Sequence, residues 1–435
     1  MIKRPFFALI TLISTCLLSF SVLAVEIKEL RSDRGITALL VEDYTLPIIS
    51  MSYSFRGGTT QDPEGKTGAV RLMAALIDEG AGDLDSAAFR ARLEELGIEL
   101  RFSSSRDFLS GGLRTLRSDR STAFDMLKLA LNEPRFDPEA IERLRDAIRT
   151  GIIRSKTNPG SVASLTLRQT LFEGHPYSLR ASGDETTIEN ISREDIADLH
   201  KKLFARDTLT VGVVGAISEE ELKQVLDETF GALPERSQAA ALVEIEPKLG
   251  ETVSIGMPVP NASVSLIYKG LKRDDPDFFA AHLMNYILGG GSFTSRLYTE
   301  VREKRGLAYG VSSGLATFEN TAYLTAGTST RADNQEEAIR IIRQEIRKLA
   351  ENGVSEEELE AAKKFVSGSY AISNLDTSGK IARVLVAIQN QNLGTDYIVK
   401  RKKLIENVTL EDVNQIAKKL LLVEPTQVVV GPATQ

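Results

Sequence analysis

Cysteine is almost absent from this 435-residue chain, whose single copy is Cys16. Cys16 lies inside an N-terminal apolar segment that is typical of a secretory signal peptide, so the exported chain keeps no thiol. Disulfides and cysteine-based metal sites are therefore both excluded. An exported protein without disulfides has to be held together by side-chain packing alone.

Histidine is also scarce. The chain has three histidines, His175, His200 and His282, and no two of them lie within one helical turn of each other. Zinc in proteins is bound by neutral imidazole, thiolate and carboxylate groups, and a histidine pair on one helix is a common part of such sites. The sequence offers no such pair.

Only one apolar run approaches the length that spans a bilayer. It extends from Pro5 to Val22, follows two basic residues and ends in small residues at Ala24. This pattern predicts a signal peptide over residues 1–24, cleaved after Ala24, and an exported, periplasmic protein. An uncleaved membrane anchor is the alternative, because the run is close to the shortest that crosses a membrane. After cleavage no membrane span is expected.

A basic stripe is missing too. The formal net charge is −7, with charges of both signs interspersed along the chain. Nucleic acid is therefore not an expected partner. The mature length of about 411 residues exceeds one ordinary hydrophobic core and predicts two domains of roughly 200 residues each. An apolar content of 42% is enough to build both cores.

The two halves of the chain repeat one layout. In each half a helix ends in a glycine, at Gly97 and at Gly306, and a strand pair, a helix and a charged helix follow. The strands come in adjacent pairs as well as between helices, which favours an α+β fold over a doubly wound sheet. We expect two homologous domains, each a mainly antiparallel sheet with helices packed on one face.

The division between the two domains is expected in the segment 237–249, which contains an alanine run and Pro247. Residues 25–236 would then form the first domain and residues 250–435 the second. Two similar domains joined by such a linker can form one half of a clamshell.

The segment Gly68–Ala75, which reads Gly-Ala-Val-Arg-Leu-Met-Ala-Ala, begins a helix after the turn-rich run Arg56–Thr67. In this setting it resembles the metal-binding helix of the pitrilysin, insulinase and mitochondrial processing peptidase family of inverzincins. The family pattern is Gly-x-Ala-His-x-x-Glu-His, in which two histidines bind Zn²⁺ and the glutamate acts as general base. The resemblance covers nearly the whole mature chain, including Gly174–Gly215 and Leu288–Tyr309.

The three motif positions carry no metal ligand in this chain, because they are occupied by Arg71, Ala74 and Ala75. The family's third ligand, a glutamate further along, would fall near Ala147–Gly151, where no glutamate occurs. The resemblance therefore implies no metal or cofactor on this chain and no peptidase activity from it alone. Arg71 either pairs with a carboxylate in the vacant position or lies on an exposed helix edge.

The resemblance also implies that the second domain keeps part of an active site. In the family an arginine and a tyrosine spaced as Arg-x6-Tyr contact the substrate, and Arg302 and Tyr309 match that spacing. A guanidinium and a phenol beside a carbonyl oxygen stabilise the charge that develops when hydroxide attacks. Alternatively, Arg302 is a solvated charge and Tyr309 a half-buried strand residue. The run Gly289–Gly291 is expected to end a helix, with a flexible substrate-binding loop as the alternative.

These features predict a split site. The chain would be a non-catalytic subunit of an exported zinc metallopeptidase, paired as a heterodimer with a zinc-bearing relative. The zinc would lie on the partner, and Arg302 and Tyr309 would act from the opposite wall. The substrate would be an unfolded or short peptide, bound by strand addition to an exposed sheet edge. The alternative is a stand-alone peptide-binding or scaffold protein on an inactive peptidase fold.

Overall fold

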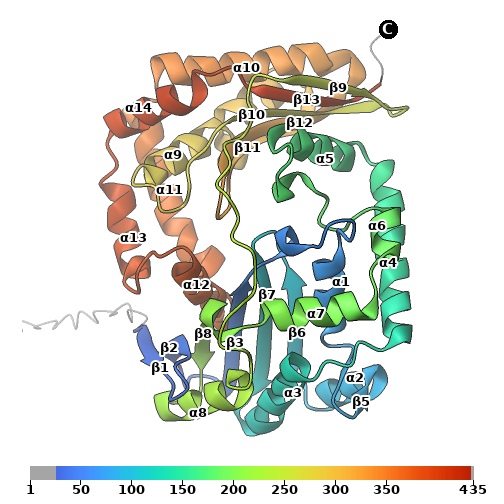
Figure 1. The fold of residues 1–435 in the computed structure, drawn as a ribbon. Coiled ribbons are helices and arrows are strands. Elements are labelled where there is room, and N and C mark those ends of the chain that lie inside the picture. Colours follow the sequence, from blue (N-terminus) through green and yellow to red (C-terminus); the bar gives the residue numbers. More distant parts are fainter. Residues whose placement is uncertain (1–25, 433–435) are drawn as a thin grey trace, which may run out of the picture.

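The computed structural model describes residues 26–432. The expected signal peptide, residues 1–24, lies outside the described residues. Two sheets with their own helices make up the molecule, and an extended segment connects them (Figure 1). In residues 26–432 no helix combines the length and the apolar composition needed to cross a membrane.

The first sheet has the strand order β1-β2-β8-β3-β7-β6. All neighbouring strands are antiparallel except β2 and β8, which are parallel. Its strands are β1 (Lys28–Arg31), β2 (Thr37–Glu42), β3 (Ile48–Arg56), β6 (Glu99–Ser104), β7 (Phe108–Leu116) and β8 (Leu209–Gly215). A separate two-stranded ribbon is formed by β4 (Gly80–Ala81) and β5 (Leu84–Asp85).

The second sheet has the strand order β11-β12-β10-β13-β9. It is antiparallel apart from the parallel pair β13 and β9. Its strands are β9 (Thr252–Gly256), β10 (Asn261–Lys269), β11 (Ala308–Thr317), β12 (Ala322–Arg331) and β13 (Thr426–Gly431). Two mainly antiparallel sheets, each packed with helices, confirm the α+β fold class.

Capping residues define where many of the helices begin. Ser192, Ser218, Ser355 and Thr409 each form a capping box at the start of a helix. In the first half the helices are α1 (Ala69–Leu76), α2 (Ser86–Glu95), α3 (Arg120–Asn132), α4 (Pro138–Lys156), α5 (Pro159–Leu171), α6 (Glu185–Glu189), α7 (Arg193–Leu203) and α8 (Glu219–Phe230). In the second half they are α9 (Phe278–Asn285), α10 (Gln335–Asn352), α11 (Glu356–Asn374), α12 (Ser378–Asn390), α13 (Tyr397–Glu406) and α14 (Leu410–Leu421).

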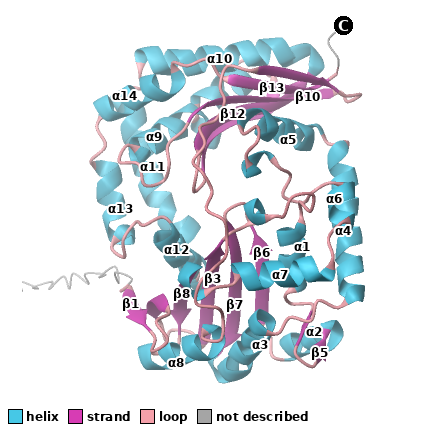
Figure 2. Cartoon of the chain, viewed as in Figure 1, coloured by secondary structure: helices cyan, strands magenta, loops and turns pink. Residues whose placement is uncertain are grey.

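The two halves exchange one helix each, which the sequence analysis did not predict. Helix α12 packs on β8 and β3 of the first sheet, and helix α5 packs on β13 and β10 of the second. Figure 2 shows α5 below the second sheet, on the side opposite α10. The expectation of helices on one face only is therefore wrong. Each sheet buries its second face partly under a helix from the other half.

Side-chain alternation in the first sheet explains this two-sided packing. Leu40 and Val213 point into the main core, whereas Leu39 and Val214 join Leu385 of α12 in a separate apolar cluster. Successive residues of a strand point to opposite faces, so a strand that is apolar at consecutive positions needs cover on both. Helix α12 supplies that cover for β2 and β8.

The segment 237–249 follows an extended path between the halves and is held by hydrogen bonds. The side-chain amide of Gln61 both donates to the carbonyl oxygen of Ala240 (3.0 Å) and accepts from its N–H (2.8 Å). His175 bonds the carbonyl oxygen of Val243 through Nε2 at 3.1 Å. The backbone N–H of Ile245 donates to the carbonyl oxygen of Asn320. The segment is thus fixed to both halves.

Candidate functional site

Helix α1 begins at a glycine with a left-handed backbone. Gly68 has φ +103°, and a Cβ there would lie 2.8 Å from the carbonyl oxygen of Ser182. The carboxylate of Asp62 accepts hydrogen bonds from the N–H groups of Gly68 (2.8 Å) and Val70 (2.7 Å). Burial raises the pKa of Asp62 to about 6. Asp62 therefore anchors the loop that leads into α1, a role that the sequence analysis missed.

The three vacant motif positions differ in their surroundings. The side chain of Arg71 is exposed and has no hydrogen bond or ion pair with any residue of 26–432, so it lies on the helix edge rather than in a carboxylate pair. Ala75, one turn further on, is half-buried on the same side of α1. Ala74 is only 2% exposed and borders a small apolar void beside Tyr53 and Phe55. A carboxylate at position 74 would be surrounded by aromatic rings.

Helix α4 passes beside α1, where the family's third ligand is expected. Its segment 147–151 carries no carboxylate. Across residues 26–432 no three histidine, cysteine, aspartate or glutamate side chains gather closely enough to hold a metal ion. The donor set around α1 therefore does not fit zinc, which takes nitrogen, sulfur or carboxylate ligands.

The three histidines take part in packing and in loop structure. His200 is 9% exposed and donates through Nε2 to the carbonyl oxygen of Leu131 at 3.0 Å. His282 stacks on Phe278. Burial lowers the pKa of both His200 and His282 to about 4, so both are neutral at pH 7. Nδ1 of His175 accepts the N–H of Tyr177 in a turn.

Arg302 and Tyr309 lie in contact with each other. The guanidinium carbon of Arg302 is 4.6 Å from the ring centre of Tyr309 and 4.9 Å from that of Tyr298. Both distances are typical of cation–π contacts. The structure therefore brings the two predicted residues together and adds Tyr298, which the sequence analysis did not single out.

The strand β11 directs Tyr309 outward through a β-bulge. The pairing of β11 with β12 shifts between Ala308 and Gly310, so Tyr309 is the extra residue. Its side chain is 86% exposed, the highest value among the large apolar and aromatic side chains of residues 26–432. A bulge re-aims the side chain of its extra residue. Tyr309 is thus not the half-buried strand residue of the alternative interpretation.

Neighbouring cations provide a comparison for Arg302. Lys304 and Arg305 both form ion pairs with Glu300 at 2.6 Å. The guanidinium of Arg302 has no ion pair and no hydrogen bond with another residue in the described part of the chain. A guanidinium held by two rings and not neutralised by a carboxylate keeps its N–H groups free for an outside acceptor.

The glycine run 289–291 ends a helix, as expected. Helix α9 continues into a π-helical turn, Tyr286–Gly290, and Gly291 follows it. A Cβ on Gly289 would lie 2.6 Å from the backbone nitrogen of Ser313 in β11. The glycine at position 289 therefore allows the turn to approach β11 closely.

Two family models match this chain. The model described as insulinase (peptidase family M16) matches residues 39–185, and the model described as the peptidase M16 inactive domain matches residues 190–366. The chain belongs to peptidase family M16. This confirms the resemblance to the pitrilysin, insulinase and mitochondrial processing peptidase family.

Relatives within family M16 include both inactive and peptidase-named proteins. The non-peptidase homolog YmxG of Helicobacter pylori is 26% identical over 379 residues, which cover 86% of each chain. A protein called an uncharacterized zinc protease, YmxG of Bacillus subtilis, is 21% identical and covers 94% of this chain and 98% of its own.

Solved structures agree with the assignment to family M16. A peptidase M16 inactive domain from Pseudomonas fluorescens superimposes with a TM-score of 0.88 at 28% identity, covering 94% of this chain and 99% of that one. The periplasmic protease PqqL of Escherichia coli shares the fold, with a TM-score of 0.81 at 18% identity. This chain covers 46% of PqqL, about half of its length.

Proposed function

We propose that this M16 chain is an exported, non-catalytic subunit that pairs with a zinc-bearing relative in a peptidase heterodimer. The partner would supply the metal and the general base. This chain would supply Arg302 and Tyr309, which contact the peptide at the bond to be cleaved. Two observations support this division of roles: the residues around α1 do not fit zinc, and Arg302 lies against the exposed Tyr309 near the start of β11.

The observation that carries this proposal is the stacking of Arg302 on a bulged, exposed Tyr309. Ordering a long arginine side chain costs conformational entropy. The contacts with two aromatic rings already order the Arg302 side chain in the free protein, so less entropy is lost when a ligand binds. A preorganised guanidinium and phenol can donate hydrogen bonds to a carbonyl oxygen as it gains negative charge. Neither group can generate the attacking hydroxide.

The position of the pair within the sheet supports action on a group outside this chain. Tyr309 lies at the start of β11, whereas the turn after Thr317 contacts the first half through Glu319 and Asp107. The eight residue steps from Tyr309 to Thr317 span about 26 Å, so the pair lies far from this contact between the two halves. Within residues 26–432, strand β11 also has only one neighbouring strand, β12, so a peptide can be added along its other edge.

The test is peptide hydrolysis by the mature chain reconstituted with an M16 relative that carries His-x-x-Glu-His. We expect zinc near one per heterodimer and activity only when both chains are present. Arg302→Ala and Tyr309→Phe should each lower kcat by about a hundredfold, the order seen when a donor to a developing oxyanion is removed. Arg305→Ala is the matched control, because Arg305 is paired with Glu300. The control should retain full activity.

Unchanged hydrolysis in Arg302→Ala and Tyr309→Phe would refute the split site. The second candidate function, a stand-alone peptide-binding or scaffold protein, is favoured by the name of the Helicobacter pylori relative, a non-peptidase homolog. It predicts that the mature chain sediments as a monomer or homodimer and that no zinc-bearing M16 chain is retained with it from the cell envelope. Recovery of such a chain at equal stoichiometry would exclude this candidate.

A further inference from the structure

A polar groove lies between the two halves, away from Arg302 and Tyr309. Its main part is a cavity of ≈ 540 Å³, and a second hollow of ≈ 260 Å³ adjoins it. Ser52, Ser110 and Arg383 line both parts. We call the two together the serine groove. The combined volume of the two hollows falls within the range of about 300–1,000 Å³ that is typical of ligand sites.

The floor of the serine groove is the part of the first sheet that α12 leaves uncovered. Ser110 and Gly112 of β7 and Ser103 of β6 belong to this floor. Their alternation with the core residues Leu109 and Leu113 places them on the outer face. Because hydroxymethyl groups and hydrogen atoms replace large side chains here, another backbone can approach the sheet closely.

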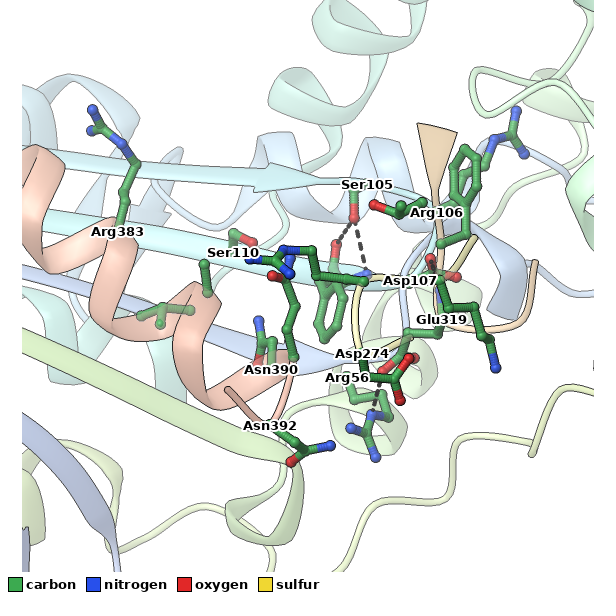
Figure 3. Close-up of a pocket in the computed structure, with 18 of the residues that line it drawn as sticks. Arg56, Ser105, Arg106, Asp107, Ser110, Asp274, Glu319, Arg383, Asn390 and Asn392 are labelled. Atoms are coloured by element: carbon green, nitrogen blue, oxygen red, sulfur yellow. Dashed lines mark hydrogen bonds and ion pairs between the residues drawn. The ribbon is translucent and has the colours of Figure 1, made fainter. Parts of the chain in front are cut away.

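The walls of the groove come from both halves. Figure 3 shows Arg383 on α12 at one side, Arg56 and Glu319 at the other, and Ser110 between them. Arg56 and Glu319 form an ion pair at 2.8 Å across the two halves. Asn392, just beyond α12, also projects into this space.

Several polar side chains of the groove are free to bind a ligand. Those of Ser52, Ser110, Gln391 and Asn392 form no hydrogen bond with any other residue of 26–432. The guanidinium of Arg383 likewise has neither a hydrogen bond nor an ion pair within the described chain. Convergent polar groups without partners in a concave site are a mark of a binding site.

The charge of the groove is opposite to that of the whole protein. Seven arginine and lysine residues line the two hollows, against four aspartate and glutamate residues, whereas the chain as a whole carries −7. Arg101 and Arg114 share one carboxylate, Glu99. The cations are therefore not fully neutralised by the protein itself. Such a groove attracts acidic groups.

We propose that the serine groove binds an extended peptide segment that carries aspartate or glutamate side chains. The free hydroxyl and amide groups match the alternating donors and acceptors of a peptide backbone. Arg383 provides a charge-assisted hydrogen bond for a carboxylate. The carboxylates of Asp274 and Glu319 in the same cavity disfavour a uniform polyanion such as nucleic acid. This deepens the proposed function by naming the peptide class.

The test is binding of a fluorescein-labelled twelve-residue peptide with alternating Glu and Ser to the full mature chain, followed by fluorescence anisotropy. The same peptide with Gln for Glu is the neutral counterpart. We expect the acidic peptide to bind about tenfold more tightly and its affinity to fall with added NaCl, because each well-placed charge contact is worth roughly a factor of ten. Equal affinity for the two peptides would overturn the proposal.

Variants separate the groove from general electrostatic attraction. Arg383→Gln should weaken binding of the acidic peptide about tenfold. Arg154→Gln, an exposed arginine on α4 outside the groove, should leave it unchanged. Gly112→Leu should abolish binding of both peptides by filling the floor. It should still fold, since a Cβ at Gly112 meets nothing closer than 3.6 Å. Equal loss in Arg383→Gln and Arg154→Gln would contradict a specific site.

Two further measurements decide between the possible ligands and between the two proposals. A labelled single-stranded oligonucleotide should bind weakly, and tight binding that is lost with Gly112→Leu would reassign the groove to nucleic acid. The binding test uses this chain alone, whereas Arg302 and Tyr309 are tested by kcat in the heterodimer. The proposed peptide site in the groove can therefore be refuted while the split site stands. Likewise, the split site can be refuted while the groove still binds the acidic peptide.

Discussion

His200 shows how a single buried side chain links the stability of this protein to pH. Its ring is buried where α7 meets α3, contacts the rings of Phe136 and Phe204, and donates a hydrogen bond to the carbonyl oxygen of Leu131. Burial lowers its pKa from an ordinary value of 6.5 to about 4 in the folded chain. The neutral form is therefore the one that folding favours.

We expect the stabilisation from neutral His200 to be complete above pH 6.5 and to be lost as the pH falls towards 4. At pH 5 the unfolded chain binds the proton and the folded chain does not, which costs on the order of 2 kcal/mol. His200→Gln can keep the bond to Leu131 but cannot titrate. Urea unfolding at pH 7 and pH 5 should show a smaller loss in His200→Gln than in the wild type. An equal loss in both proteins would show that His200 does not titrate in this range.

The candidate site was only partly predictable at the level of residues. The family resemblance and the spacing of Arg302 and Tyr309 predicted the pair, but the bulge at Tyr309 and the second ring, Tyr298, depend on strand register and on a π-helical turn. Neither has a local sequence signal, because the Ala308–Tyr309–Gly310 stretch also fits a regular strand. The exposed position of Arg71 likewise required the structure.

Helix α12 is the element whose packing could not be read from the sequence. The apolar runs 36–41 and 48–55 predict strands from the sequence alone, and they correspond to β2 and β3. Their periodicity indicates which side chains are buried but not which helix buries them. Helix α12 lies far along the chain from the sheet that it covers, and only long-range packing assigns it there.

Two glycines on the outer face of the first sheet test this packing. At Gly212 in β8 a Cβ would lie 2.6 Å from the carbonyl oxygen of Ala382 and 2.7 Å from the Cβ of Leu385, both in α12. At Gly112 in β7, which α12 leaves uncovered, the nearest atom is 3.6 Å away. Gly212→Ala should lower the free energy of unfolding by about 1–3 kcal/mol through overpacking.

The matched variant Gly112→Ala should be neutral or slightly stabilising, since alanine restricts the unfolded chain more than glycine does. Urea denaturation of both variants provides the measurement. If Gly112→Ala loses as much stability as Gly212→Ala, the contact between α12 and β8 is not the cause.

On the scale of the whole molecule, the exchange of α5 and α12 makes the two halves depend on each other. A buried carboxylate adds to this coupling: Asp107 accepts the hydroxyl of Tyr177 at 2.6 Å and the N–H of Glu319 at 3.2 Å. Tyr177 in turn accepts the N–H of Asn320. Contacts from the first sheet and from the β11–β12 turn therefore meet around one side chain.

We expect the mature chain to unfold in a single cooperative transition, with equal calorimetric and van't Hoff enthalpies. The fragments 25–236 and 250–435, expressed separately, should be insoluble or loosely packed, because each lacks the helix that covers one face of its sheet. Asp107→Ala should lower the melting temperature of the whole chain without splitting its transition. Two resolved transitions in the wild type would show that the halves fold independently.

The sequence by itself determined the family, the repeated α+β layout and the loss of zinc ligands, because these depend on residue identity and on local periodicity. It also predicted Arg302 and Tyr309 as site residues, because their spacing matches the family resemblance. Only the tertiary structure decided that the halves exchange helices, that Arg302 stacks between two rings, and that a serine groove with excess cations opens beside α12. The helix exchange and the groove arise from contacts between residues that are distant along the chain, and such contacts leave no local pattern in the sequence. The stacking of Arg302 depends on the bulge at Tyr309 and on a π-helical turn.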